Sequence, residues 1–348
     1  MTRRERVLSA VNHEQPDRTP ADFQAVSEIW ERLFEHFRTQ DMKDVLDRLD
    51  IDCAWVDPEV TRKPSEKDAE GLTIGWGGSR IRTIYNAYGA HDEIVRYATD
   101  GCDTIETMEA ALALPDLDEY DFSGIDKACE KYQGRFLLGG FASIFYYPTL
   151  IRRMEDILVD MALNEELAVY LFNRCFDWHM EYHKRLLEAG KGRIDAMQLA
   201  DDFATQLDLI MSKEMFVKYF RKSMCEYIAL AKSYGAIPFL HCCGSAYHLI
   251  SEFIDMGIKI LDPVQTVARN MEPERLKAEF GGNITFHGGG ETQHILPHGT
   301  PEDARQNARM LSQTLGKCGG YILSSCHFFQ SDVSVDNILA FYELENRS

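Results

Sequence analysis

Short apolar runs alternate with longer amphipathic stretches along almost the whole chain, and this alternation restricts the fold more than any other feature. Eight runs have the length and composition of β-strands. They are approximately Arg18–Phe23, Asp52–Val56, Phe136–Phe141, Ile194–Ala200, Ala236–His241, Ile258–Asp262, Ile284–His287 and Tyr321–Ser324. Strands that alternate with helices form parallel sheets, and eight such units predict closure into a (β/α)8 barrel of the α/β class.

The stretches between these runs have the periodicity of helices. The clearest helical patterns are Glu165–Leu187, Lys213–Ser233, Ala246–Met256, Pro301–Leu315 and Val335–Tyr342. The regular spacing breaks once, between the second and third strands, where Gly77 and Gly78 predict a turn between two extended arms. We therefore expect residues 1–348 to form a single barrel domain, with residues 57–135 as an insertion and a candidate lid over one mouth.

The charge and the cysteine content indicate which partners and which cellular compartment to expect. Fifty-six acidic against 37 basic residues give a net charge of −19, which repels nucleic acid and anionic lipid. The chain has no apolar stretch of about 18 residues and no signal-peptide core at its start, so we expect neither membrane insertion nor export. Nine scattered cysteines do not resemble a disulfide scaffold, and they predict thiols or metal ligands in the cytoplasm.

A candidate metal site lies at the end of the fifth predicted strand, in the sequence His-Cys-Cys-Gly. His241 and Cys243 are two residues apart on a strand and therefore share a face, whereas Cys242 points the other way. The carboxyl ends of barrel strands build the active site, so this pair is expected where small-molecule chemistry takes place.

The eighth predicted strand brings a third soft ligand, Cys326, to the equivalent height. One imidazole and two thiolates suit zinc, and three protein ligands leave a position open for a reactant. Taken singly, each of these residues is more often an ordinary core residue, and only their joint position favours a metal. The neighbouring His327 competes with Cys326 for the third place, and we prefer Cys326. We interpret His179 and His183 as one helix face.

The order of four motifs, HCCG, LDPVQ, FHGGGETQ and GGYILSSCH, resembles the uroporphyrinogen decarboxylase superfamily over nearly the whole chain. The resemblance implies a (β/α)8 barrel. True uroporphyrinogen decarboxylases begin with an arginine-rich segment that binds the carboxylates of the substrate. The corresponding stretch here, residues 17–24, has the single arginine Arg18, so we do not expect decarboxylation of uroporphyrinogen.

The His-x-Cys…Cys pattern looks like the corrinoid-dependent zinc methyltransferase branch, which includes methylcobamide:coenzyme M methyltransferases. This resemblance implies zinc at His241, Cys243 and Cys326. It also implies methyl transfer between a corrinoid (cobalamin), carried by a separate partner protein, and a small thiol or methyl ether. The branch tends to have Pro-Gly-Cys-Gly around the third ligand, where this chain has residues 324–327 as Ser-Ser-Cys-His. The departure leaves the identity of the methyl donor or acceptor open.

Other polar residues follow the predicted strands closely and are candidates for the remaining roles. Asp202 and Glu291 are the candidate catalytic groups. The candidate substrate-binding residues are Asp201, Gln206, Asp262, Gln265, His287, Gln293 and His327. For each of these residues the alternative is a loop cap or a hydrogen bond at the barrel rim.

Two other functions remain open on the sequence. A metal-independent decarboxylase acting on a small carboxylate would use Asp202 or His327 to handle protons. A non-catalytic binding or metal-storage protein would retain the barrel alone. The assembly also remains open, with a homodimer as one candidate.

Overall fold

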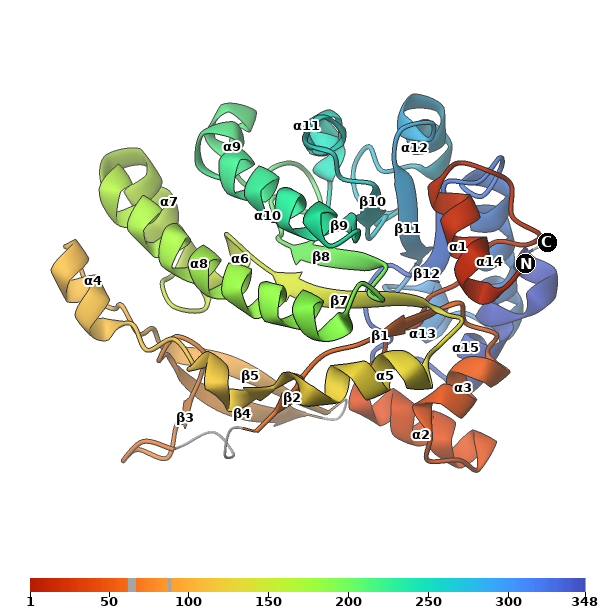
Figure 1. Ribbon diagram of the computed structural model, residues 1–348, viewed down its shortest axis with the longest axis horizontal. Helices are drawn as coiled ribbons and strands as arrows, with labels where there is room; N and C mark the ends of the chain where they lie inside the picture. The colour runs from red at the N-terminus through yellow and green to blue at the C-terminus, as the bar shows by residue number, and fades with distance from the viewer. Residues whose placement is uncertain (62–66, 87–88, 348) are drawn as a thin grey trace.

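The computed structural model describes residues 1–61, 67–86 and 89–347, and its centre is a parallel seven-stranded sheet. The sheet curls on itself, with helices outside it (Figure 1). In spatial order its strands are β1 (Cys53–Trp55), β7 (Phe136–Ala142), β8 (Ala196–Ala200), β9 (Ile237–His241), β10 (Ile260–Asp262), β11 (Thr285–Gly290) and β12 (Tyr321–Ser325). Each lies within a few residues of a strand that the sequence predicts.

The first predicted strand, residues 18–23, closes the barrel although it makes only an isolated bridge to β12. The backbone N–H of Asp22 donates to the carbonyl of Leu323 at 2.9 Å. On the other side, the N–H of Asp52 donates to the carbonyl of Ala21 at 2.8 Å. The segment therefore lies between β12 and β1 in the eighth position, and the predicted (β/α)8 barrel is confirmed.

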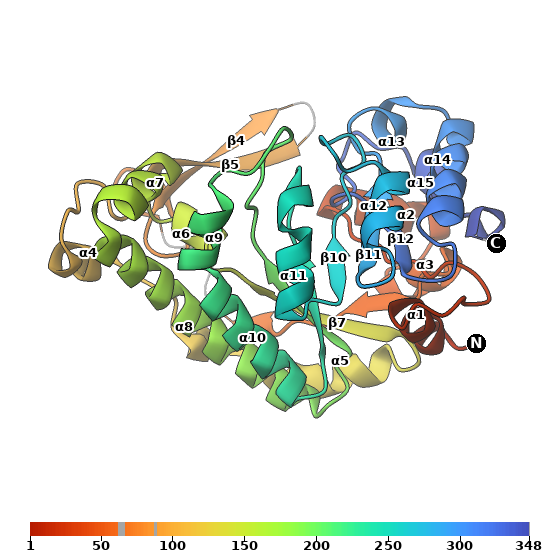
Figure 2. The ribbon, with the colours of Figure 1, turned by 90° about the horizontal axis from the view of Figure 1, so that it is seen from above.

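Most of the described helices surround the curled sheet, and α1 lies at the amino end of the strands (Figure 2). They are α1 (Arg3–Val11), α2 (Ser27–Phe37), α3 (Met42–Arg48), α4 (Ile105–Ala111), α5 (Ile125–Lys131), α6 (Tyr146–Thr149), α7 (Met154–Leu163), α8 (Glu165–Gly190), α9 (Lys213–Tyr219), α10 (Arg221–Ser233), α11 (Ile250–Met256), α12 (Pro273–Phe280), α13 (Ile295–His298), α14 (Pro301–Thr314) and α15 (Val335–Tyr342). The helix predicted over residues 213–233 is divided at the buried Phe220. None of the described helices is long and apolar enough to cross a membrane.

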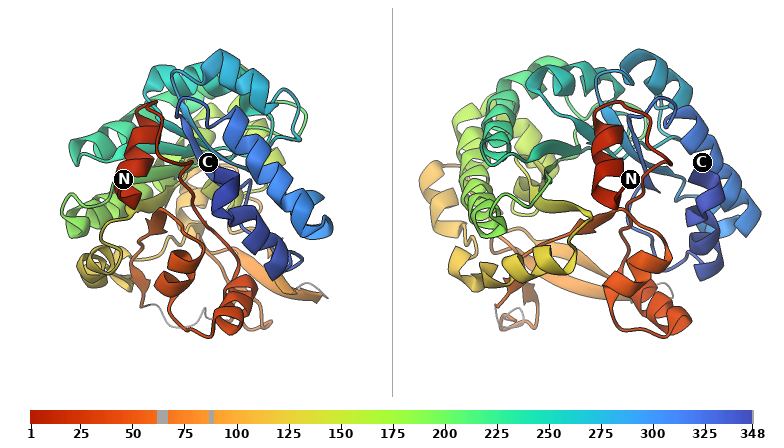
Figure 3. Two further views of the ribbon diagram at one scale, coloured as in Figure 1. Left: turned by 90° about the vertical axis from the view of Figure 1, so that its right-hand side faces the viewer. Right: turned by 45° about the vertical axis from the view of Figure 1, so that its right-hand side comes forward.

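Two apolar cores hold these layers together. The larger core lies between the sheet and the outer helices, and it includes Phe216, Phe253 and Phe286. The smaller core fills the inside of the barrel and includes Val7 of α1 and Phe239 of β9. Helix α1 thus packs its apolar face on the barrel interior at the amino end of the strands (Figure 3). Water is excluded there, and the opposite end of the barrel remains for polar side chains.

The described residues between β1 and β7 include two small antiparallel sheets as well as α4 and α5. The strands β3 (Thr73–Ile74), β4 (Arg80–Asn86) and β5 (Gly89–Arg96) form one sheet, and β2 (Glu59–Val60) pairs with β6 (Tyr120–Asp121). Gly77 and Gly78 have φ angles of +72° and +97° in the turn between β3 and β4, where the sequence predicts a turn. The pairing of β4 with β5 was not anticipated, because charged residues interrupt its alternation. The role of residues 57–135 as a lid remains a prediction.

We expect the substitution Asp52→Ala to lower the free energy of unfolding, because Asp52 joins the segment of residues 18–23 to the rest of the barrel. The buried Asp52 carboxylate accepts hydrogen bonds from Arg6 at 2.7 Å, Arg18 at 2.7 Å and the N–H of Ala21 at 2.8 Å. Removal of one partner from a buried ion pair costs about 3–5 kcal/mol, because a charge is left without compensation. Urea denaturation should show a loss of this size. The control is Asp118→Ala, which removes an exposed ion pair with Arg185; equal losses in the two variants would contradict the prediction.

Candidate metal centre

The register of the parallel strands places His241 inside the barrel. Phe239 belongs to the interior core, and His241 follows it by two residues, so both side chains point inward. In the neighbouring strands the residues level with His241 are Ala200 of β8 and Asp262 of β10. The carboxyl ends of three strands therefore meet at the height of this imidazole.

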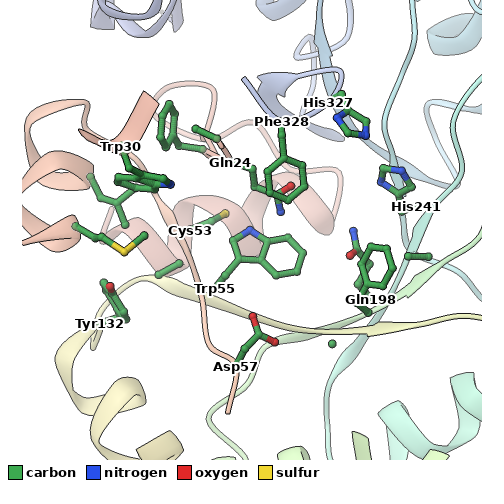
Figure 4. Close-up of a pocket in the computed structure, with 18 of the residues that line it drawn as sticks. Gln24, Trp30, Cys53, Trp55, Asp57, Tyr132, Gln198, His241, His327 and Phe328 are labelled. Carbon is green, nitrogen blue, oxygen red and sulfur yellow. The ribbon is translucent and has the colours of Figure 1, made fainter. Parts of the chain in front are cut away.

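His241, Cys243 and His327 form a group, which we call the ligand cluster, whose ligand atoms all lie within 4.8 Å of one another. His241 Nε2 is 3.3 Å from Cys243 Sγ. An imidazole nitrogen and a thiolate sulfur that share a tetrahedral zinc are roughly 3.5 Å apart, so these two atoms are spaced as ligands of one ion. Figure 4 shows the rings of His241 and His327 next to each other at one edge of a cavity, and their centroids are 6.2 Å apart.

Cys326, the predicted third ligand, lies beside the ligand cluster rather than in it. Its sulfur is buried and is 3.0 Å from the Thr292 hydroxyl. Burial raises the pKa of Cys326 and Cys243, and the two thiols are close enough for Cys326 to raise the pKa of Cys243 further. Strand β12 ends at Ser325, so strand alternation no longer sets the direction of the next side chains. The assignment of Cys326 as a ligand remains a prediction.

A buried carboxylate, Asp262, contacts the His241 ring of the ligand cluster on the side away from Cys243. Its oxygens lie 2.6 Å from Nδ1 of His241 and 2.6 Å from Nδ1 of His287. Nε2 of His287 is in turn 3.2 Å from the buried Asp22 carboxylate. These contacts orient the imidazoles of His241 and His287, and the substrate-binding roles predicted for Asp262 and His287 remain predictions.

The charges in this buried chain compensate one another. Burial opposes the charge of His287, but the carboxylates of Asp262 and Asp22 raise its pKa to about 9. Burial likewise opposes the ionisation of Asp262, but the two imidazoles hold the pKa of Asp262 well below its usual range. An ionised Asp262 accepts the Nδ1–H of His241. It thereby leaves Nε2 as the lone-pair nitrogen that faces Cys243.

Asp22 and Trp55 are residues of this chain that the sequence did not single out. The Trp55 Nε1–H donates to Asp22 at 3.1 Å, so the chain from His241 ends at a side chain that lines the cavity. Trp55 follows the interior residue Cys53 by two positions. Strand alternation could therefore have identified it.

Two of the predicted site residues hold loops in place. The buried Asp201 carboxylate accepts hydrogen bonds from the Ser143 hydroxyl and from the backbone N–H groups of residues 144–146. The Glu291 carboxylate accepts from the backbone N–H groups of residues 293–295, which include that of Gln293, at the start of α13. Both carboxylates therefore anchor loops, and Asp201 also lines the cavity beside the ligand cluster. Substrate binding by Asp201 and catalysis by Glu291 remain predictions.

The turn that carries Cys243 is held by three other predicted residues. Asp202 accepts the backbone N–H of Cys243 at 2.8 Å and lies 4.0 Å from Nε2 of His241. Gln265 accepts both from the N–H of Gly244 and from the Gln206 amide. Gly244 has a φ of +84°, and a Cβ at this position would lie 2.5 Å from a backbone oxygen. Asp202 therefore lies next to the ligand cluster, and its catalytic role remains a prediction.

A cavity of about 550 Å³ adjoins the ligand cluster. Aromatic side chains make up much of its wall: Phe23, Trp30, Trp55, Phe141, Tyr146 and Phe328. His241 and His327 lie at one edge, and Gln24, Gln198, Asp57 and Asp202 are among the polar lining residues (Figure 4). No lysine or arginine occurs among the described residues that line the cavity.

These features place the chain among the (β/α)8 barrels that carry a polar site at the carboxyl ends of their strands. Residues 101–347 match the family described as uroporphyrinogen decarboxylase (URO-D), so the chain belongs to this family. The resemblance seen in the sequence motifs is thereby confirmed.

Solved structures support the same fold. A methyltransferase from Methanosarcina mazei superimposes with a TM-score of 0.65 over 98% of this chain and 97% of that chain, at 15% sequence identity. The IOLI protein with a bound zinc atom has a TM-score of 0.36 at 15% identity, over 62% of this chain and 78% of its own, which is too distant to inform the site. No curated protein matches the sequence.

We expect Asp262→Asn to weaken metal binding while the barrel stays folded. The amide of asparagine cannot accept hydrogen bonds from both imidazoles, so the orientation of His241 is no longer fixed. Loss of a partner behind a metal ligand typically lowers affinity about 10–100-fold. Zinc titration against a chelator of known affinity measures this change, and Asp208→Asn, outside the ligand cluster, is the control. Unchanged zinc affinity with intact circular dichroism would contradict the supporting role of Asp262.

Proposed function

We propose that the protein is a zinc-dependent methyltransferase. It moves a methyl group between a corrinoid carried by a partner protein and a small thiol or methyl ether. The observation that carries the proposal is the ligand cluster at the carboxyl ends of the barrel strands, beside a cavity of substrate size. The likeness in fold to a methyltransferase supports the same reaction class.

The donor set suits zinc. His241 and Cys243 provide an imidazole and a thiolate, and the third ligand is Cys326 or His327. A bound zinc would supply Lewis-acid activation of a thiol or of an ether oxygen. With Cys326 as the third ligand the set carries two negative charges, which favours thiol chemistry. With His327 it carries one, which favours activation of an ether.

The other residues of the site position the ligands and the substrate. Asp262 holds the His241 ring, and Asp202 holds the backbone of Cys243. The aromatic walls of the cavity would exclude water from the reacting groups and hold the apolar body of a substrate next to the ligand cluster.

We expect protein purified without added zinc to contain close to one zinc per chain. Removal of that metal by a chelator should abolish methyl transfer between a methylated corrinoid protein and a thiol or ether, because the reacting oxygen or sulfur loses its activation. Metal analysis and a methyl-transfer assay measure the two quantities, and restored zinc should restore the activity. A metal-free preparation that still transfers methyl groups would refute the proposal.

The competing function is a metal-independent decarboxylase of a small carboxylate, which family membership supports. The cavity argues against it, because its described lining residues include no lysine or arginine to bind a carboxylate. Substitution of both Cys243 and Cys326 by serine separates the two functions. Such a decarboxylase would keep nearly full activity, whereas the methyltransferase would lose zinc and turnover.

We expect Cys326→Ala to lower the zinc content at least about tenfold, because a thiolate binds zinc more tightly than an exposed imidazole does. His327→Ala should retain zinc and change only turnover. Zinc titration of the two variants measures both effects. Full zinc retention by Cys326→Ala, together with loss from His327→Ala, would instead assign the third ligand to His327, which lies in the ligand cluster.

A further inference from the structure

The cavity contains a carboxylate, Asp57, that the ligand cluster does not use. Asp57 follows β1 by two residues, and it lines the cavity together with Cys53, Ala54 and Trp55 of that strand. Figure 4 shows Asp57 on the Trp55 side of the cavity, whereas His241 and His327 lie at the other edge. The two ends of the cavity therefore offer different chemistry.

Asp57 has no charge partner among the described residues. Its side chain is exposed to solvent inside the cavity, where its carboxylate accepts a hydrogen bond from the N–H of Gly140 and the surrounding protein raises its pKa to about 6. The nearby Tyr147 and Tyr182 are neutral phenols, and the negative charge of Asp57 helps to raise the pKa of both. At neutral pH the carboxylate is thus mostly ionised, and no described residue forms an ion pair with it. A cation that enters the cavity can therefore form a charge-assisted hydrogen bond with Asp57.

The other two carboxylates among the described lining residues already have partners in the protein. The oxygens of Asp201 accept hydrogen bonds from the hydroxyl and N–H groups that follow β7. Asp202 accepts the N–H of Cys243 and lies beside the ligand cluster, where a bound metal would balance its charge. Among the carboxylates of the described lining residues, Asp57 is left for a substrate.

The aromatic walls of the cavity also favour a positive charge. The faces of Trp, Tyr and Phe rings attract ammonium groups; Trp55 lies next to Asp57 in Figure 4, and Trp30 and Tyr146 line other parts of the cavity. The net charge of −19 draws cations toward the protein and repels anions. An anionic substrate would meet no lysine or arginine among the described lining residues.

We propose that the cavity binds a substrate with an ammonium-type cation on an aromatic or otherwise apolar body, and that Asp57 determines this specificity. The cation lies against Asp57 and the Trp55 ring, and the thiol or methyl ether reaches the ligand cluster. The assignment of the reacting group rests on the proposed methyltransferase function. The cation site rests only on the cavity.

Isothermal titration calorimetry with three one-ring probes tests the proposal: benzylamine is a cation, benzyl alcohol is neutral and benzoate is an anion. The wild-type protein should bind benzylamine most tightly, at least about tenfold more tightly than benzoate. Asp57→Asn should lower benzylamine affinity at least about tenfold and change benzyl alcohol affinity less than about threefold. The control Glu59→Gln removes an exposed negative charge two residues away that does not line the cavity, and it should change neither affinity.

The proposal is overturned if benzoate binds as tightly as benzylamine, or if Asp57→Asn keeps its benzylamine affinity. An equal loss in Glu59→Gln would also overturn it, because long-range attraction would then explain the preference. The titrations are made on zinc-loaded and on chelator-treated protein, whose fold is checked by circular dichroism. Failure of methyl transfer would refute the proposed function and leave the cation site standing. Loss of probe selectivity would refute the cation site and leave methyl transfer untouched.

Discussion

The arrangement of the site depends on one buried carboxylate between two imidazoles. Asp262 can stay ionised inside the barrel because His241 and the charged His287 lie on either side of it, each at 2.6 Å. These three residues come from β9, β10 and β11, so the interaction requires the observed register of the three strands. His287 extends the chain to Asp22 in the segment that closes the barrel. The hydrogen bonds that orient His241 therefore also connect the site to the closure of the fold.

The cavity shows how one barrel can carry two kinds of recognition. At one edge, imidazole and thiol groups converge at a distance suited to a soft metal ion. At the other side, Asp57 lies next to Trp55. In the proposed binding mode, a substrate that contacts both ends would be held in one orientation, with its reacting group at the ligand cluster. A substrate held in the reactive orientation has a lower activation barrier than one that is bound as tightly without a fixed orientation.

Family membership and cavity chemistry lead to different expectations about the substrate. The family description refers to a decarboxylase of a highly carboxylated molecule. This cavity instead has aromatic walls and carboxylates, and its described lining residues include no lysine or arginine. A shared barrel fixes where a site is built, whereas the side chains at the strand ends decide what it binds. The position of the site therefore follows the family, and its proposed specificity follows residues such as Asp57.

The sequence by itself determined the alternation of strands and helices, the barrel class and the inward direction of His241, because the two-residue period of a strand is a local property. It also indicated that Asp262 and His287 belong to the site. Only the tertiary structure decided their roles, since hydrogen-bond partners on neighbouring strands are far away in sequence. Asp57 was missed because it follows β1 directly and was counted with the insertion. The contacts by which Asp201 and Glu291 anchor loops could not be predicted, because the loop N–H groups that they bind are placed only by folding. For Cys326 and His327, the end of β12 at Ser325 removes the strand period, so the path of the following turn sets which side chain faces His241.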